Sequence, residues 1–189
     1  RAPHWKAMML AWLRQRGNIR RTAGSLYGSI VTQARSKGLY AQWGVPDTNE
    51  GRFEIIALHL VLVSCRLARE GRRGTELGQA LTEAFVVDLD DTLREMTVGD
   101  LAVPRHVKRA VAALHDRYSI YQAALASPRD DLLAAAVEQR LATLSGAEAL
   151  DVPAICAYIR ASAHALEGQP GDEVLRGSLA WPQAGVEAA

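Results

Sequence analysis

The most apolar stretch of the chain lies near its centre, from residue 55 to 63, where only His59 interrupts a run of hydrophobic side chains. A run of this length is too short to cross a bilayer and is typical of a helix buried on most of its sides. Before it, Pro46 restricts the backbone to a turn, and Asp47 and Glu50 have the spacing of a helix capping box. We therefore predict a central helix that begins after Asp47 and is packed by all the others.

Elsewhere, hydrophobic residues recur at steps of three and four, which is the spacing of amphipathic helices. Gly17 is placed to end a first helix, and Asn18 can cap a second helix that continues to about Ser36. Later helices are expected in these places: residues 75–98, from Pro104 to about Leu125, after a start signal at Ser127–Asp130, and after a capping Asp151. No stretch alternates with a period of two. The predicted fold class is all-α, a single compact bundle-like domain of about six or seven helices.

Three parts of the chain differ in composition. Residues 1–17 are expected to form a basic amphipathic N-terminal helix, and residues 18–167 are expected to form the main helical domain. Residues 168–189 are rich in Gly and Pro and lose the helical spacing, so we expect a mobile C-terminal tail. Leu179 and Trp181 are expected to attach this tail locally.

Small residues line one side of the second predicted helix. Gly24 and Gly28 lie four positions apart, and Ser25, Ser29 and Thr32 lie beside them. Small residues at this spacing permit close approach by another helix. Because glycine inside a helix costs about 1 kcal/mol relative to alanine, the pair implies a packing partner, either inside the protein or outside it.

The net charge of +1 hides a strong asymmetry, because the first 46 residues contain eight basic and no acidic side chains. The remainder contains 14 basic and 21 acidic side chains. A basic end favours contact with an anionic surface, either phospholipid or RNA, and tryptophans on one side of a basic helix suit a membrane interface. The alternative is that the basic arm pairs with acidic helices of the same protein. The candidate surface residues are Trp5, Lys6, Trp12, Arg14, Arg16, Arg20 and Arg21.

No catalytic residue can be assigned from a motif, since glycine-rich phosphate loops, nucleophile elbows and known Cys–His spacings are absent from the sequence. Cys65 and Cys156 form neither a disulfide framework nor a metal-site spacing, which fits a reducing compartment. His59 is interpreted as a neutral core histidine with a hydrogen-bonding partner. We expect no metal and no cofactor.

Residues 90–95, DDTLRE, weakly resemble the aspartate-rich Mg²⁺ motif of all-α isoprenoid synthases, in which carboxylates bridge the metal to pyrophosphate. No second acidic motif and no basic pair accompany it. A metal-dependent all-α enzyme acting on isoprenoid pyrophosphate is therefore the alternative to a binding protein.

Several blocks of the sequence are similar to the ubiquinol–cytochrome c chaperone family: YGSIVTQAR at residues 27–35, LYAQWGVPDT at 39–48, GRFE at 51–54 followed by LH, and DLDDTLREMTVGDLAVPRHVK at 88–108. The similarity covers about residues 27–125, with a departure at Thr97, where glycine is expected. The resemblance implies a non-enzymatic assembly chaperone. Such a protein binds newly made cytochrome b and promotes assembly of the ubiquinol–cytochrome c reductase (bc1) complex.

The resemblance also implies where such a protein acts. Family members act beside the membrane, which implies a peripheral position on the cytoplasmic side of the inner membrane in a bacterium, or on the matrix side in a mitochondrion. For mitochondrial members of the family, the resemblance also implies a small helical partner protein and a position near the ribosome exit. A ribosome- or RNA-binding module built on the basic arm is a further alternative, and no DNA partner is expected. The sequence begins at Arg1 and leaves open whether a targeting peptide precedes it.

The client-binding site is expected in the blocks that carry the resemblance. Asp88, Asp91 and Glu95 lie at steps of three and four along one edge of a predicted helix, where they repel one another. These negative charges can be neutralised by a basic segment of the client or by Arg52 from the central helix. The alternative to a client site is an internal ion-pair network that only fixes helix packing. The candidate residues are Tyr40, Trp43, Arg52, Asp88, Asp91, Arg94 and Glu95.

Overall fold

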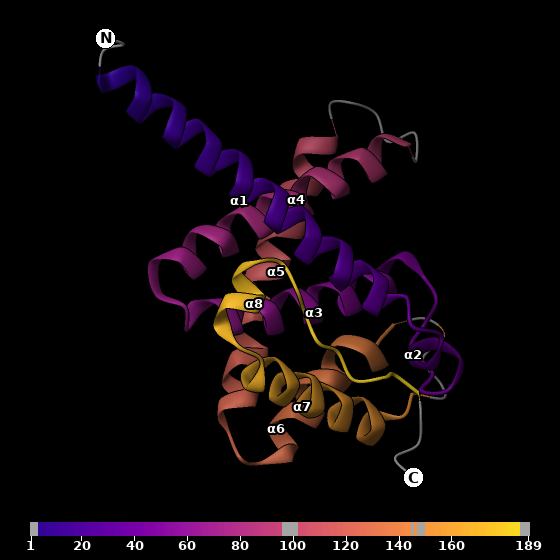
Figure 1. The fold of residues 1–189 in the computed structure, drawn as a ribbon. Helices are drawn as coiled ribbons and strands as arrows, with labels where there is room; N and C mark the ends of the chain where they lie inside the picture. The colour runs from indigo at the N-terminus through magenta and orange to yellow at the C-terminus, as the bar shows by residue number, and fades with distance from the viewer. Residues whose placement is uncertain (1–3, 96–101, 145, 147–149, 186–189) are drawn as a thin grey trace.

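The computed structural model describes residues 4–95, 102–144, 146 and 150–185, with side chains from Arg14 onward. Its elements in chain order are α1 (His4–Ala34), α2 (Lys37–Ala41), α3 (Asn49–Ala68), α4 (Gly71–Glu95), α5 (Val103–Ala126), α6 (Asp130–Val137), a π-helical turn (Glu138–Ala142), α7 (Val152–Gly168) and α8 (Gly171–Leu175). Every regular element among these residues is helical, and together they form a bundle-like arrangement (Figure 1). The predicted all-α fold is confirmed. No described helix is both long enough and apolar enough to span a membrane.

Helix α3 forms the centre of the fold and contacts α1, α4, α5 and α7 (Figure 1). From Ile55 to Val63 every side chain except that of Ile56 is buried. Because neighbouring helices cover α3 on several sides, apolar residues surround most of its circumference. The prediction of a central helix is therefore confirmed, although α3 packs mainly against these four helices and not against all the others.

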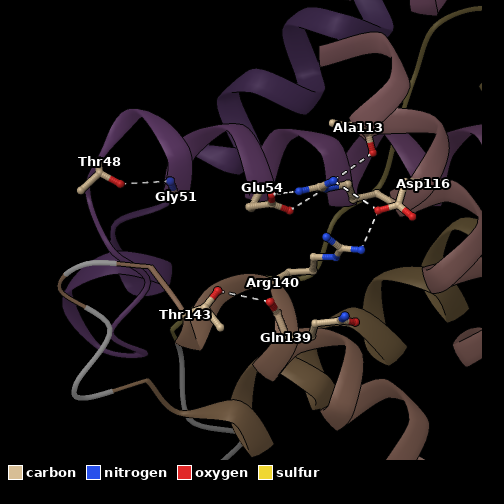
Figure 2. Close-up of polar contacts among 9 residues, drawn as sticks. Thr48, Gly51, Glu54, Ala113, Asp116, Gln139, Arg140 and Thr143 are labelled. Carbon is tan, nitrogen blue, oxygen red and sulfur yellow. Dashed lines mark hydrogen bonds and ion pairs between the residues drawn. The ribbon is translucent and has the colours of Figure 1, made fainter. Parts of the chain in front are cut away.

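The start of α3 differs from the predicted capping box. The N-cap is Thr48, one residue after Asp47, and its Oγ1 accepts a hydrogen bond from the Gly51 backbone N–H at 3.1 Å (Figure 2). Glycine is required here, since a Cβ at position 51 would lie 2.0 Å from the carbonyl oxygen of Pro46. Asp47 lies outside the helix and accepts a hydrogen bond from Arg52 instead. Asp and Thr both cap helices, so residue type alone does not choose between neighbours.

Helix α1 is continuous through Gly17, so the predicted helix end at this residue is wrong. A glycine that ends a helix usually adopts a positive φ angle, and Gly17 does not. One interior glycine costs about 1 kcal/mol, which does not offset helical hydrogen bonding on both sides of it. The first half of α1 projects from the body of the molecule, and its second half crosses α4 (Figure 1).

Helix α4 begins at Gly71, earlier than the predicted Thr75, and Gly71 itself adopts a φ of +60° in the turn from α3. Its described part ends at Glu95, so the predicted continuation to Val98 lies outside the described residues. Helix α5 carries a proline in its first turn, as predicted. Its seam is only partly covered: Tyr121 is buried, whereas Val111 is 36% exposed.

The C-terminal part of the chain is not the free tail that the sequence suggested. Gln169 and Val174 are buried, and Leu179 and Trp181 pack against the core as expected. The segment after α8 crosses the face of the molecule formed by α1, α3 and α7 (Figure 1). Helical periodicity could not reveal this packing, because most of the segment is extended.

Candidate functional site

The contact between α1 and α4 is built around Tyr27. Its hydroxyl donates a hydrogen bond to Asp88 Oδ2 at 2.8 Å, and its ring packs edge-on against Phe85 with centroids 6.5 Å apart. Phe85 in turn packs against Phe53 of α3. Burial, followed by the neighbouring Asp88 carboxylate, raises the pKa of Tyr27, so the hydroxyl stays protonated and donates. Asp88 is therefore held by a hydrogen bond to a small aromatic cluster of Tyr27, Phe85 and Phe53.

The acidic edge predicted on α4 is present, but only one end of it is tied to the protein. Asp91 and Glu95 are exposed and have no hydrogen-bonding partner among the described residues. The Nε of Arg94 donates to Asp90 Oδ2 at 2.7 Å, and Asp90 is not one of the three edge residues. Like charges at helical spacing repel. The edge therefore presents negative charge to solvent.

Arg52 does not form an ion pair with the acidic edge, so one of the two expected sources of neutralising charge is wrong. Its Nε donates to Asp47 Oδ1 at 2.7 Å, and the two side chains are 58% and 60% exposed. The hydrogen bond from Arg52 lowers the pKa of Asp47. Such an exposed pair contributes little to stability and is available to a partner.

Tyr40 and Trp43 occupy two different sides of the α2 region. The Tyr40 hydroxyl donates to the Ala34 carbonyl oxygen at 2.7 Å, which ties α2 to the end of α1. The Trp43 ring packs against Tyr158 of α7 with centroids 5.5 Å apart, and its carbonyl oxygen accepts from the Asp151 N–H. Both aromatic residues are half-buried, so they seal the edge of the core and still expose part of their rings.

The two glycines in the small-residue stripe of α1 face outward. Gly24 and Gly28 are exposed, and a Cβ at either position would meet nothing within 4 Å. On α4, Val87 is 60% exposed and precedes Asp88, which bonds Tyr27 between the two glycines of α1. No described helix packs on the two glycines, so any packing partner for them is external. The serines of the same stripe have an internal partner, because Ser29 accepts from Trp181 and Ser25 lies beside Gly177 in the C-terminal segment. We call this surface the α1–α4 face; it consists of Gly24, Gly28, Val87, Asp88, Asp91 and Glu95.

Basic residues gather where α1 crosses the start of α4. Arg14, Arg16, Arg20 and Arg21 are exposed on α1, and two grooves of about 300 and 480 Å³ bring Arg72 and Arg73 beside the first three. Glu76 lines both grooves and accepts from Arg72 at 2.8 Å, so α4 also offers the basic arm an acidic neighbour within the protein. The two α4 arginines precede the helix predicted over residues 75–98 and were not among the candidates, although their adjacency was a visible signal. We call these six arginines the basic surface. Trp5, Lys6 and Trp12 lie on α1, but their side chains are outside the described part of the structure.

A buried ion pair that sequence reasoning missed joins α3 to α5. Arg117 binds both carboxylate oxygens of Glu54, which is 6% exposed, and its guanidinium lies 5.9 Å from the centre of the Phe53 ring. Next to it, Asp116 accepts from Arg140 of the π-helical turn at 2.6 Å (Figure 2). The signal in the sequence was a glutamate next to the start of the apolar run. This network fixes helix packing.

His59 is buried and neutral, as predicted. Its Nδ1–H donates to the Ile55 carbonyl oxygen, and its Nε2 accepts from the Tyr158 hydroxyl, both at 2.7 Å. Burial lowers the pKa of His59 to about 4. Among the described residues, no three His, Cys, Asp or Glu side chains are grouped to hold a metal ion. Both cysteines are free thiols.

The candidate residues thus form separate groups: Tyr40 and Arg52 beside Asp47, Trp43 against α7, the acidic edge at the end of the described part of α4, and the basic surface at its start.

Comparison with known proteins identifies the family of this chain. The crystal structure of the Cbp3 homolog from Brucella abortus is 28% identical in sequence and superimposes with a TM-score of 0.79, covering 93% of this chain and 97% of that chain. No curated protein sequence matches the chain. The family model described as ubiquinol-cytochrome C chaperone matches residues 41–181, which is most of the sequence. The chain therefore belongs to the ubiquinol–cytochrome c chaperone family.

Proposed function

We propose that this protein is a non-enzymatic chaperone for assembly of the bc1 complex that binds newly made cytochrome b. The observation that carries the proposal is the family match over residues 41–181, supported by the likeness of the whole fold to a Cbp3 homolog. A protein that holds a membrane subunit needs exposed small or apolar positions flanked by charge, and no catalytic centre. The α1–α4 face has these properties.

On this face the two glycines allow an apolar client helix to approach the backbone of α1 closely. The exposed carboxylates of Asp91 and Glu95 lie at its edge and suit a basic loop of the client. Arg52 and Arg94, which are both exposed, and the exposed parts of Tyr40 and Trp43 extend the proposed contact region. Tyr and Trp are common anchors of protein interfaces.

The basic surface is the proposed contact with an anionic membrane or with the ribosome. This contact places the protein peripherally on the cytoplasmic side of the inner membrane, or on the matrix side in a mitochondrion. The small helical partner is placed on a groove of about 350 Å³ between α3, α4 and α5. Leu60, Val111, Leu114 and Tyr118 line this groove, and it exposes the uncovered seam of α5.

The isoprenoid enzyme is not favoured by the arrangement of the acidic segment. Asp88 is bonded to Tyr27 and Asp90 to Arg94, so two of its carboxylates serve contacts within the protein. No observation on the described residues supports pyrophosphate binding at this position.

The test is affinity purification of the tagged full-length chain from solubilised membranes, with cytochrome b as the readout. The variant Asp88→Asn, Asp91→Asn and Glu95→Gln removes the charge of the edge. The amide oxygen of an asparagine at position 88 would still accept the Tyr27 hydrogen bond, so stability should change by less than about 1 kcal/mol. Most of the cytochrome b should be lost. The matched control neutralises exposed carboxylates elsewhere: Asp131→Asn, Glu138→Gln and Asp172→Asn.

Two failures have different meanings. If the wild type retains no cytochrome b, the proposed client is wrong. If the wild type and the folded triple variant retain it equally, the client is right and the acidic edge is not its binding site. A loss of stability well above 1 kcal/mol in the triple variant would support the internal ion-pair alternative instead.

A further inference from the structure

The chain after α8 forms an extended strap, which we define as residues 178–185. It crosses the face formed by α1, α3 and α7 (Figure 1, yellow), and Gly177 and Gly185 at its two ends have φ angles of +92° and +85°. Few residues other than glycine adopt such angles readily. Both ends of the strap are therefore sharp turns, and the residues between them have no regular structure.

The strap is held by side chains rather than by main-chain pairing. The Trp181 indole N–H donates to Ser29 Oγ at 3.0 Å, and Gln33 Nε2 donates to the Pro182 carbonyl oxygen at 2.8 Å. Near its start, the Ala180 N–H donates to Gln169 Oε1 at 3.0 Å. Beyond Ser178, no backbone-to-backbone hydrogen bond of the described strap residues is present. The strap can therefore leave the body without breaking the hydrogen bonds of any helix.

Trp181 is the anchor of the strap. Its ring lies edge-on to His59, with centroids 5.1 Å apart, and His59 in turn bonds the Tyr158 hydroxyl. Gln33, which holds the strap, also donates to the Tyr158 hydroxyl at 2.9 Å. Trp43 packs on the other side of Tyr158. The strap thus covers a shelf of aromatic rings that would otherwise be partly open to solvent.

Beside the strap, the shelf continues into a groove of about 1020 Å³ that no described residue fills. Its floor is a row of small side chains on α7, and its wall is the strap itself through Pro182 and Gln183. The floor residues are Ala154, Ala157 and Ala161. An extended chain lying on this floor would need to move only the strap, not a helix.

We propose that the strap is an internal ligand of a peptide-binding groove, and that an extended segment of a partner protein carrying an indole followed by proline displaces it. The chemistry of the occupant is taken from the strap. An indole N–H meets Ser29, its ring meets His59, and the carbonyl oxygen of the following proline meets Gln33. This inference does not depend on which client the chaperone binds.

The test uses a fluorescently labelled peptide of residues 176–185 and the full-length chain, with binding measured by anisotropy. In the wild type the tethered strap competes with the free peptide at an effective concentration on the order of 1 mM. If the peptide binds the open groove with a Kd of about 100 µM, it should bind the wild type about tenfold more weakly than a chain whose strap is released. The released chain is the full-length variant Trp181→Ala. The same peptide carrying Trp181→Ala is the control and should bind neither protein.

Two further measurements make the result decisive. Adding Ser29→Ala and Gln33→Ala to the Trp181→Ala chain should weaken peptide binding, because both hydrogen bonds to the peptide are lost. Amide hydrogen exchange of the wild type should show the Ala180 N–H, the strap amide that bonds Gln169, opening independently of α7, and this holds even if Trp181→Ala folds poorly. The proposal is overturned if the peptide binds both chains equally or neither. It is also overturned if the Ala180 amide exchanges only when the whole protein unfolds.

Discussion

Replacing His59 with leucine tests whether this histidine is a structural residue. In the wild type its Nδ1–H donates to Ile55 and its Nε2 accepts from Tyr158, a tautomer fixed by the fact that a carbonyl oxygen can only accept. In His59→Leu the Ile55 carbonyl keeps its helical partner, but the buried Tyr158 hydroxyl loses its acceptor. Gln33 donates to that hydroxyl through Nε2 and does not replace the acceptor, but the buried Ser162 hydroxyl also lies beside it and can accept. The free energy of unfolding at pH 7 should fall by about 1–3 kcal/mol.

The pH dependence gives a sharper test. Burial lowers the pKa of His59 to about 4, whereas an unfolded chain has a histidine pKa near 6.5. Between these values the unfolded state binds a proton that the native state does not, so stability present above pH 6.5 is lost as the pH falls towards 4. A gap of about 2.5 pKa units corresponds to about 3 kcal/mol. Because His59→Leu lacks this effect, its deficit should shrink by about that amount between pH 7 and pH 4.

Urea unfolding followed by helical circular dichroism, at several pH values and one ionic strength, measures both effects. His164→Leu is the matched control, since His164 is exposed, and it should follow the wild-type pH profile. Parallel profiles for the wild type and His59→Leu would refute the assignment of a buried neutral histidine. A His59→Leu chain that kept its stability but lost cytochrome b would make His59 a client-binding residue.

The structure supports three further predictions. Glu54→Gln removes one charge of a buried pair and should lower the free energy of unfolding by about 3 kcal/mol or more, measured by urea titration. Binding to acidic liposomes should weaken steeply from low to physiological salt and should fall further in Arg72→Gln, Arg73→Gln; equal binding to neutral liposomes would contradict the basic surface. Gly24→Ala and Gly28→Ala should each raise the free energy of unfolding by up to about 1 kcal/mol, seen as a higher melting temperature, because the space beside them is open. A loss of stability would place a hidden neighbour there.

The helices of the body were predictable because their packing leaves a local record in the sequence. The run around His59 is apolar on nearly every side because helices surround α3, and Asp151 caps α7 as its position suggested. Gly17 misled because a glycine ends a helix only where the chain also turns away. The strap was missed for a different reason. Trp181 is bonded to Ser29 across 152 positions of sequence, and no periodic pattern records such a contact.

The candidate site shows the same limit. The spacing of Asp88, Asp91 and Glu95 predicted an acidic edge, and the ion pair of Asp90 with Arg94 follows the same four-residue spacing. The partner of Asp88 was not predictable, because Tyr27 reaches it from another helix. Local spacing therefore predicted which charged residues lie on the surface, but not which of them bond to other parts of the protein.

The charges of α4 oppose the dipole of the helix, and this opposition supports a functional reading of both ends. A helix N-terminus carries partial positive charge and its C-terminus partial negative charge. Yet α4 has Arg72 and Arg73 and no acidic residue in its first turn. Towards the end of its described part, Asp88, Asp91 and Glu95 outnumber the one basic residue of the last turn, Arg94, which bonds Asp90. Each such charge costs a few tenths of a kcal/mol near a helix end, so helix stability does not explain the pattern. At 1.5 Å per residue the two groups lie about 30 Å apart. One helix can therefore direct an anionic surface to one end of the molecule and a basic client segment to the other.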